Sequence, residues 1–111
     1  MSTKALYYTE TTANVNASTT FDGSVRSMVD PPHNHRQYFN AVAFSSHAGT
    51  LKVLASFDGG STYIEVDTVA VSAGVPAKLK TPIIADLMRA RYVNGGTNTT
   101  TFALATALTD A

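Results

Sequence analysis

The sequence predicts an all-β protein, built as an antiparallel sandwich or barrel of about eight short strands. Val, Thr, Tyr and Phe dominate the ordered stretches, and Gly, Asn, Asp and Pro separate these stretches at short intervals. Within the stretches the side chains alternate with a period of two, which directs one set toward a core and the other outward. The alternation is clearest at Leu51, Val53, Ala55 and Phe57.

Each expected strand follows one alternating stretch and ends where turn-forming residues begin. The expected strands cover residues 5–8, 24–29, 38–45, 50–57, 63–66, 77–81, 88–94 and 101–108, with a weaker extended stretch at 69–72 grouped with the fifth.

Glycine and proline place the breaks between these strands. The Asp-Gly-Gly-Ser segment at 58–61 predicts a hairpin, because glycine readily adopts positive φ. Residues 94–98, Asn-Gly-Gly-Thr-Asn, are expected to join the last two strands in the same way, and Ala48-Gly49 to close another turn. Pro31-Pro32 marks a loop. The one helical candidate is a single turn at 81–87, where Pro82 suits the first helical turn.

The aromatic residues divide into a predicted core and a predicted surface. The phenylalanines expected in the core are Phe39, Phe44, Phe57 and Phe102. Tyr7 and Tyr8 are consecutive, so on a strand they point to opposite faces and one of them stays exposed. An exposed tyrosine is a candidate anchor for a partner protein, or a half-buried edge residue.

Residues 1–20 differ in composition from the rest of the chain. They are rich in Thr, Asn, Ser and Ala and contain few apolar anchors. We therefore expect a polar N-terminal strand or arm that is either a loop or ordered by a partner. Residues 21–111 are expected to form the sandwich domain.

Charge and composition exclude several classes of partner. The chain has 8 Lys and Arg and 8 Asp and Glu, so its formal net charge is zero and it has no global field to attract a nucleic acid. It contains no apolar run long enough to span a membrane and no apolar signal sequence at its start, so we expect synthesis in a cytoplasm. It contains no cysteine, which excludes disulfides and thiol chemistry.

No residue pattern predicts catalysis or a cofactor. A serine nucleophile motif and spaced carboxylates are missing, so we predict a protein that is not an enzyme. The alternative weighed against this is a metal site at His33 and His35, with Asp30 and His47 as further ligands. A loop with solvated histidines explains the same spacing, and we predict no catalytic, cofactor-binding or metal-binding residue.

Four basic residues are candidates for binding a partner. Lys78 and Lys80 share one strand face, and so do Arg89 and Arg91. If these two strands are neighbours, half of the basic residues form one patch for an acidic protein surface. The competing interpretation is an ordinary solvated strand face. The predicted partner-binding residues are thus Tyr7, Tyr8, Lys78, Lys80, Arg89 and Arg91.

Several segments resemble a known family of phage proteins. They are Ser56-Phe57-Asp58-Gly59-Gly60-Ser61-Thr62-Tyr63, Asp67-Thr68, Ser72-Ala73-Gly74, residues 91–97 (Arg-Tyr-Val-Asn-Gly-Gly-Thr) and residues 102–109 (Phe-Ala-Leu-Ala-Thr-Ala-Leu-Thr). Over roughly residues 37–109 the sequence resembles the small jelly-roll capsid decoration proteins, of the staple or cement type, such as that of a short-tailed Salmonella bacteriophage.

This resemblance implies a fold and a function. It implies a jelly-roll-like antiparallel β-sandwich that binds the outer surface of the phage head and staples neighbouring major capsid proteins. The implied protein is a homodimer in the virion, made in the host cytoplasm, that stabilises the mature shell and binds neither nucleic acid nor membrane. The alternative is a carbohydrate-binding jelly roll on a phage tail or fibre.

Overall fold

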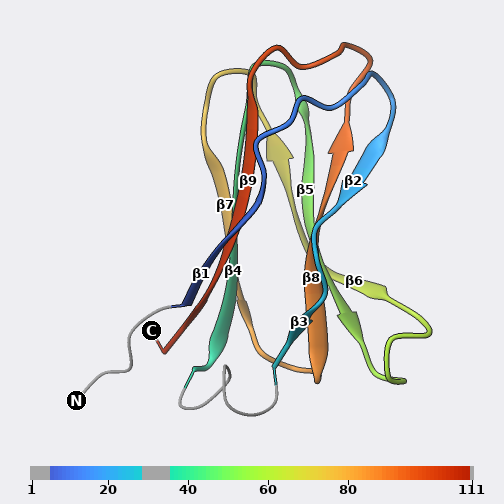
Figure 1. The fold of residues 1–111 in the computed structure, drawn as a ribbon, viewed down its shortest axis with the longest axis vertical. Helices are drawn as coiled ribbons and strands as arrows, with labels where there is room; N and C mark the ends of the chain where they lie inside the picture. Colours follow the sequence, from blue (N-terminus) through green and yellow to red (C-terminus); the bar gives the residue numbers. More distant parts are fainter. Residues whose placement is uncertain (1–5, 29–35, 111) are drawn as a thin grey trace.

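The computed structural model describes residues 6–28 and 36–110, which form two antiparallel β-sheets packed face to face (Figure 1). The strands are β1 (Leu6–Thr11), β2 (Thr20–Asp22), β3 (Arg26–Ser27), β4 (Tyr38–Ser45), β5 (Gly49–Ser56), β6 (Ile64–Val71), β7 (Ala77–Pro82), β8 (Leu87–Asn94) and β9 (Phe102–Thr109). None of the residues in the two described ranges is helical, and so none of them forms an apolar helix that would cross a membrane. The predicted all-β sandwich is confirmed.

The order of the strands is that of a jelly roll. One sheet has the order β1-β9-β4-β7, and the other has the order β2-β8-β5-β6 with β3 also paired to β8. The pairs β1 with β9, β2 with β8, β4 with β7 and β5 with β6 are nested along the chain. A long hairpin wound into two sheets has this nesting, which defines a jelly roll rather than a barrel.

Most strand bounds agree with the alternation of the sequence, and three elements differ. β6 is a single strand of eight residues that unites the stretches at 63–66 and 69–72. Of the strand expected at 24–29, the described residues form only the two-residue strand β3, and β2 lies before it, where no strand was expected. The helical turn expected at 81–87 is wrong, because Thr81 and Pro82 end β7 and Leu87 begins β8. Pro82 is tolerated there because β7 is an edge strand.

Two glycine-rich segments that look alike in sequence form different kinds of connection between strands. The segment 58–61 forms the predicted hairpin between β5 and β6, with φ of 77° at Gly59 and 103° at Gly60. Residues 94–98 do not form a hairpin, since β8 and β9 lie in different sheets and the connection crosses between them. Sequence alone could not separate the two cases, because the strand partner is chosen by distant residues.

The core lies between the two sheets and contains two of the four predicted phenylalanines. Phe39 and Phe102 are buried, and the Phe102 ring lies 4.6 Å from the ring of Tyr92. Phe44 is half-buried. Phe57 is 61% exposed, so its prediction as a core residue is wrong. β5 ends at Ser56, so Phe57 lies beyond the last residue whose direction is fixed by strand pairing.

Residues 6–20 pack on the sandwich through β1 and a tethered loop. β1 is the edge strand beside β9. In the loop, Val15 is buried, its N–H donates to Thr99 Oγ1 at 2.8 Å, and Asn94 Nδ2 donates to its carbonyl at 3.1 Å. The structure therefore includes this part of the predicted arm in the sandwich, and the ordering of the arm by a partner stays a prediction.

Candidate interaction face

The outer side of the β1-β9-β4-β7 sheet is the candidate site, and we call it the β9 face. Along each strand, buried residues alternate with residues that face outward. The outward residues are Tyr7 and Thr9 on β1, Ala103, Ala105, Ala107 and Thr109 on β9, Tyr38, Asn40, Val42 and Phe44 on β4, and Lys78 and Lys80 on β7.

A shallow apolar groove of about 250 Å³ runs along this face. Tyr7, Asn40 and Val42 form its walls, and Ala105 and Ala107 form its floor. Tyr7 is 79% exposed and Val42 is 44% exposed. An exposed aromatic side chain beside a flat apolar floor is typical of a protein-binding surface.

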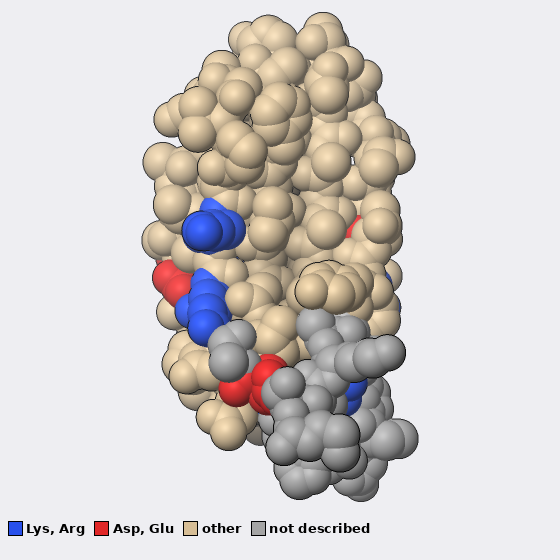
Figure 2. All heavy atoms as spheres, turned by 90° about the vertical axis from the view of Figure 1, so that its left-hand side faces the viewer, with Lys and Arg blue, Asp and Glu red and all other residues tan. Residues whose placement is uncertain are grey.

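The β9 face carries little charge. Its described charged residues are Lys78 and Lys80, both on the edge strand β7. The Lys80 Nζ atom lies 4.5 Å from the centre of the Tyr38 ring, a cation–π contact. Figure 2 views this side of the molecule: most of the basic and acidic atoms gather along one margin and next to the grey atoms, and uncharged residues cover most of the remaining surface.

The opposite sheet is charged but internally compensated. Arg91 pairs with Asp22, and this hydrogen bond raises the pKa of Arg91 above its ordinary value. Lys52 Nζ lies 2.7 Å from Glu65 Oε1. Arg89 donates two hydrogen bonds, of 2.7 and 3.0 Å, to the Gly23 carbonyl.

The four basic candidates therefore do not form one patch. Lys78 and Lys80 are on β7, Arg89 and Arg91 are on β8, and these strands belong to different sheets. The sequence could not show this, because residues 77–82 and 87–94 are neighbours in the chain. Partner binding by any of these residues stays a prediction.

Tyr7 and Tyr8 point to opposite sides of β1, as expected. Tyr8 is half-buried, and the Arg26 guanidinium lies 3.8 Å from the centre of its ring. Tyr8 therefore contributes to the closing of the sandwich, whereas Tyr7 is the residue available on the β9 face.

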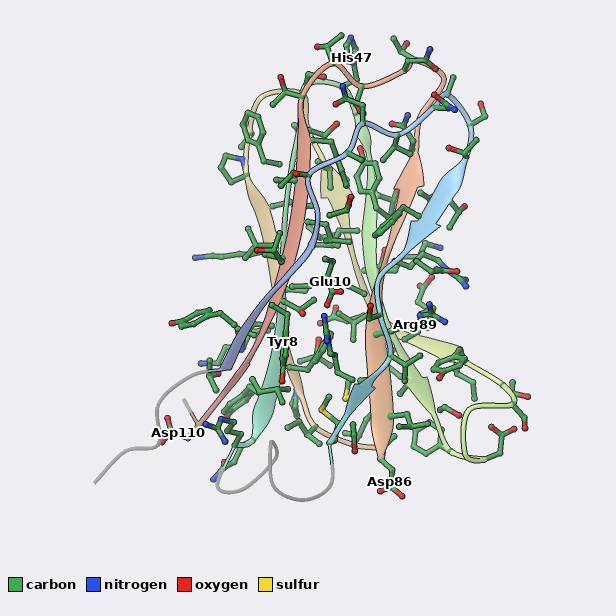
Figure 3. The ribbon with its side chains drawn as sticks, in the orientation of Figure 1. Tyr8, Glu10, His47, Asp86, Arg89 and Asp110 are labelled. Atoms are coloured by element: carbon green, nitrogen blue, oxygen red, sulfur yellow. The ribbon has the colours of Figure 1, made fainter. Side chains whose placement is uncertain are left out.

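Glu10 forms a polar clasp that the sequence did not reveal. Its side chain lies between the two sheets and is 1% exposed (Figure 3). It accepts hydrogen bonds from Arg26 Nη2 at 2.9 Å, Thr106 Oγ1 at 2.6 Å and the Ser24 N–H at 3.1 Å. Since Glu10 belongs to β1 and Arg26 to β3, the clasp joins the two sheets at one open edge. The only sequence signal is a glutamate in a threonine-rich strand.

The described residues do not gather into a metal centre. His33, His35 and Asp30 lie outside the described residues. His47 is the expected ligand that the structure does describe. It lies at the end of the sandwich opposite the end that carries Asp86, and its Nδ1 is 2.9 Å from Ser46 Oγ (Figure 3). In the ranges 6–28 and 36–110, no three His, Asp or Glu side chains are placed to hold one ion.

Comparison with known proteins identifies relatives of this fold. Residues 1–109 match the family described as the uncharacterised protein YqxG N-terminal domain. The PBSX exported protein XepA has a similar structure, with a TM-score of 0.85 and 20% identity over 96% of this chain. This chain spans only 37% of the length of the XepA chain. No curated protein matches the sequence.

Two further solved structures share the fold at lower similarity. PirA has a TM-score of 0.57 and 11% identity, and the match covers 95% of this chain and 92% of that one. A structure of Bacillus endospore appendages, which form disulfide-linked pili, has a TM-score of 0.53 and 14% identity over 96% of this chain and 82% of that one. At these identities the likeness establishes the fold alone.

Proposed function

The chain belongs to the YqxG N-terminal domain family, and from that premise we propose that it is a non-enzymatic structural module of a phage particle. In this role it holds protein subunits together, and the β9 face is one of its contact surfaces. The more specific form of the proposal is a decoration protein on the outer surface of the head. There it binds the major capsid protein and stabilises the mature shell. The protein itself is made in the host cytoplasm.

The observation that carries this proposal is the nearly uncharged β9 face with its exposed Tyr7. Protein interfaces are enriched in aromatic side chains and depleted of charged residues at their centres. A flat sheet face also loses little conformational entropy on binding, because its backbone is already fixed by strand pairing. The surface thus suits a permanent contact with another protein better than the binding of a small, charged substrate.

The structural relatives support a role in assembly. XepA is described as an exported protein of PBSX, and the endospore appendages are described as pili. Both descriptions concern proteins that act outside the cell that makes them or that build a larger structure. The strand order agrees with the jelly roll that the resemblance to decoration proteins implies.

Binding to purified shells tests the proposal. We expect the full chain to co-sediment with empty mature phage shells at a fixed stoichiometry and to raise their melting temperature. Ala105→Glu places a carboxylate in the floor of the groove, so it is expected to weaken binding more than about tenfold. Ala70→Glu, at an exposed position on β6, is the matched control. Shells that neither retain the chain nor gain stability would refute the proposal.

A carbohydrate-binding module of a tail or fibre is the second candidate. One end of the sandwich, formed by residues 12–19, 46–48 and 95–101, contains no Lys, Arg, Asp or Glu. A hollow of about 210 Å³ at this end has Asn14, Asn16, Thr19 and Phe21 among its lining residues. Amide and hydroxyl groups beside an aromatic ring suit a neutral sugar. Specific retention on host surface polysaccharide would favour this function over the first.

A further inference from the structure

The connection from β8 to β9 begins at the pair Asn94-Gly95 (Figure 1), and we propose that Asn94 is a modification site whose reaction is controlled by the fold. In the folded protein its side-chain amide is inert. In the unfolded chain it converts spontaneously to aspartate or isoaspartate, and either product prevents the native structure from forming again. The inference does not depend on the proposed function, because Asn94 belongs to the other sheet and lies outside the β9 face.

The chemistry is the general reaction of an asparagine that precedes a glycine. The Gly95 nitrogen forms a bond to Cγ of Asn94, the bond from Cγ to Nδ2 breaks, and ammonia leaves with the proton of the Gly95 N–H. Water then opens the resulting succinimide ring at either carbonyl, which gives aspartate or isoaspartate. Glycine favours the attack because it has no Cβ to obstruct the nitrogen. Asn94-Gly95 is the only Asn-Gly pair in the sequence.

The folded structure blocks the attack by holding the Gly95 nitrogen away from Cγ. Asn94 is the last residue of β8, where it is extended and pairs with Gly49 of β5. Ring closure requires the backbone at Asn94 to rotate out of this extended conformation, which would break the pairing. The Gly95 N–H is also engaged, since it donates to the Ala48 carbonyl at 3.1 Å.

The surroundings of the amide block the steps that follow the attack. Asn94 is 4% exposed, and among the described residues its Oδ1 is the buried side-chain atom that lacks a hydrogen-bond partner. No donor is therefore placed to stabilise the negative charge that Oδ1 acquires when the nitrogen attacks. Nδ2 faces acceptors, the carbonyl oxygens of Val15, Asn16 and Thr97 at 2.9–3.1 Å. A carbonyl oxygen has no proton to give to the departing nitrogen.

The same three carbonyls exclude the products from the native fold. Aspartate would place a carboxylate oxygen where Nδ2 now donates, so that a buried negative charge would face three acceptors. Isoaspartate carries the chain through its side chain and lengthens the backbone by one atom, which moves the Gly95 N–H away from the Ala48 carbonyl. Each product therefore removes contacts that hold the end of β8 to its neighbours.

The fold nevertheless requires both residues of this reactive pair. The Asn94 amide satisfies carbonyls of the loop before β2 and of the connection after β8. A Cβ at Gly95 would lie 2.6 Å from the Ala48 carbonyl oxygen, so that only glycine allows this close approach. The most labile pair in the sequence thus stands where the folded structure protects it.

Peptide mass mapping of the full chain tests the protection. One sample is kept in native buffer and another in guanidinium chloride, both at the same mildly alkaline pH. We expect Asn94 to convert in denaturant and to convert more than about a hundredfold more slowly in native buffer, since only rare unfolded molecules react. Asn98, exposed in the same connection and followed by threonine, is the internal standard and is expected to react slowly in both samples. Equal rates at Asn94, or no conversion in denaturant, would overturn the inference.

Refolding tests the consequence of the modification. After dilution from denaturant, the yield of native protein is expected to fall in step with the conversion of Asn94, and the refolded molecules are expected to contain the unmodified residue. Denaturation for the same time at mildly acidic pH is the control, because the Gly95 nitrogen attacks far more slowly while it keeps its proton. Equal losses at the two pH values, or native protein that contains the modified residue, would contradict the inference.

A direct substitution tests whether the fold accepts the product. Asn94→Asp is expected to prevent folding or to lower the melting temperature by more than about 10 °C. Asn98→Asp is the matched control, because Asn98 Oδ1 accepts from the Ala17 N–H at 2.6 Å and a carboxylate oxygen can do the same. It adds the same charge to the same connection and should shift the melting temperature by less than about 3 °C. An Asn94→Asp protein as stable as the control would show that the modification is harmless and would refute the proposal.

Discussion

Phe57 and Phe102 show when the alternation of the sequence predicts the burial of a side chain and when it does not. Both follow the alternating pattern of the sequence, yet Phe102 is 2% exposed and Phe57 is 61% exposed. Phe102 begins β9 and contacts Tyr92 in the core, whereas Phe57 follows the last residue of β5 and enters the hairpin. Alternation gives the phase of a strand but does not say where the strand ends.

Alanine substitution separates the two positions. Phe102→Ala is expected to lower the free energy of unfolding by about 3–5 kcal/mol, because it removes a buried ring and leaves a cavity. Phe57→Ala is the matched control and should change this free energy by less than about 0.5 kcal/mol. Urea denaturation of both variants measures the difference. Similar losses at the two positions would show that the Phe57 ring is buried in solution.

We expect Glu10 to contribute more to the free energy of unfolding than its place in a polar strand indicates. Its carboxylate is buried and accepts hydrogen bonds from three residues, while the Arg26 side chain remains 22% exposed. Removing one member of such a pair leaves a desolvated charge without its partner.

Glu10→Gln is expected to lower the free energy of unfolding by about 2–4 kcal/mol, since the amide keeps the shape of the side chain but loses its charge. Glu65→Gln removes a carboxylate of an exposed pair with Lys52 and should cost less than about 1 kcal/mol. Thermal or urea unfolding of the two variants gives the comparison. Equal effects would contradict the clasp.

At the scale of the element, the β5–β6 hairpin is held by its own polar side chains. Asp58 Oδ1 accepts hydrogen bonds from the Thr62 N–H at 2.9 Å and from Ser56 Oγ at 3.0 Å. These bonds, that from the Thr62 backbone first, lower the pKa of the exposed Asp58 carboxyl below its ordinary value of 3.8. The folded state therefore binds a proton at Asp58 less readily than the unfolded state.

This shift gives the hairpin a pH dependence with a definite sign. The contribution of Asp58 is present above its unfolded pKa and is lost as the pH falls through the lower folded pKa. We expect Asp58→Ala to be less stable than wild type near neutral pH, with the gap closing toward about pH 2. Thr62→Ala keeps the backbone N–H and should retain most of the wild-type profile. A gap that does not change with pH would contradict the prediction.

Elements with a strong local signal could be predicted, and their partners could not. β4 agrees with the expected bounds because its alternation is regular from Tyr38 to Ser45. β2 and β3 are too short to show a period, and β6 contains a bulge that divides its pattern. The pairing of β1 with β9 depends on contacts between the two ends of the described chain, for which one sequence has no local signal.

The same reasoning explains the candidate site. The sequence placed Tyr7, Lys78 and Lys80 on strands with an exposed side, and the structure places all three on the β9 face. It could not show that the outward alanines of β9 lie beside Phe44, Val42 and Asn40 of β4. These residues become neighbours only because β9 pairs with β4. The surface is thus a product of the sheet order rather than of any motif.

At the scale of the whole molecule, polar contacts close both open sides of the sandwich. Glu10 joins β1 to β3 on one side, and Thr81 Oγ1 donates to Asp67 Oδ2 at 3.0 Å to join β7 to β6 on the other. The first contact makes β1 an integral part of the body of the molecule.

Deletion of residues 1–20 tests whether β1 is an integral part of the folded molecule. The deletion removes β1, the buried Val15 and the Glu10 clasp, so we expect a loss of more than about 4 kcal/mol, a large part of the stability of a small domain. The truncated chain should lose its cooperative thermal transition, measured by circular dichroism. Addition of the 1–20 peptide is expected to restore part of it. An unchanged transition would instead show a separable arm.

The nested pairing of the strands has a consequence for how the protein is made. The hairpin of β5 and β6 is local and forms early, but β1 must wait for β9, since Leu6 pairs with Leu108. During synthesis β1 therefore remains without its partner until almost all of the described chain has been translated. Such long-range closure makes folding slow, and it leaves a threonine-rich edge open to other chains while the protein is being produced.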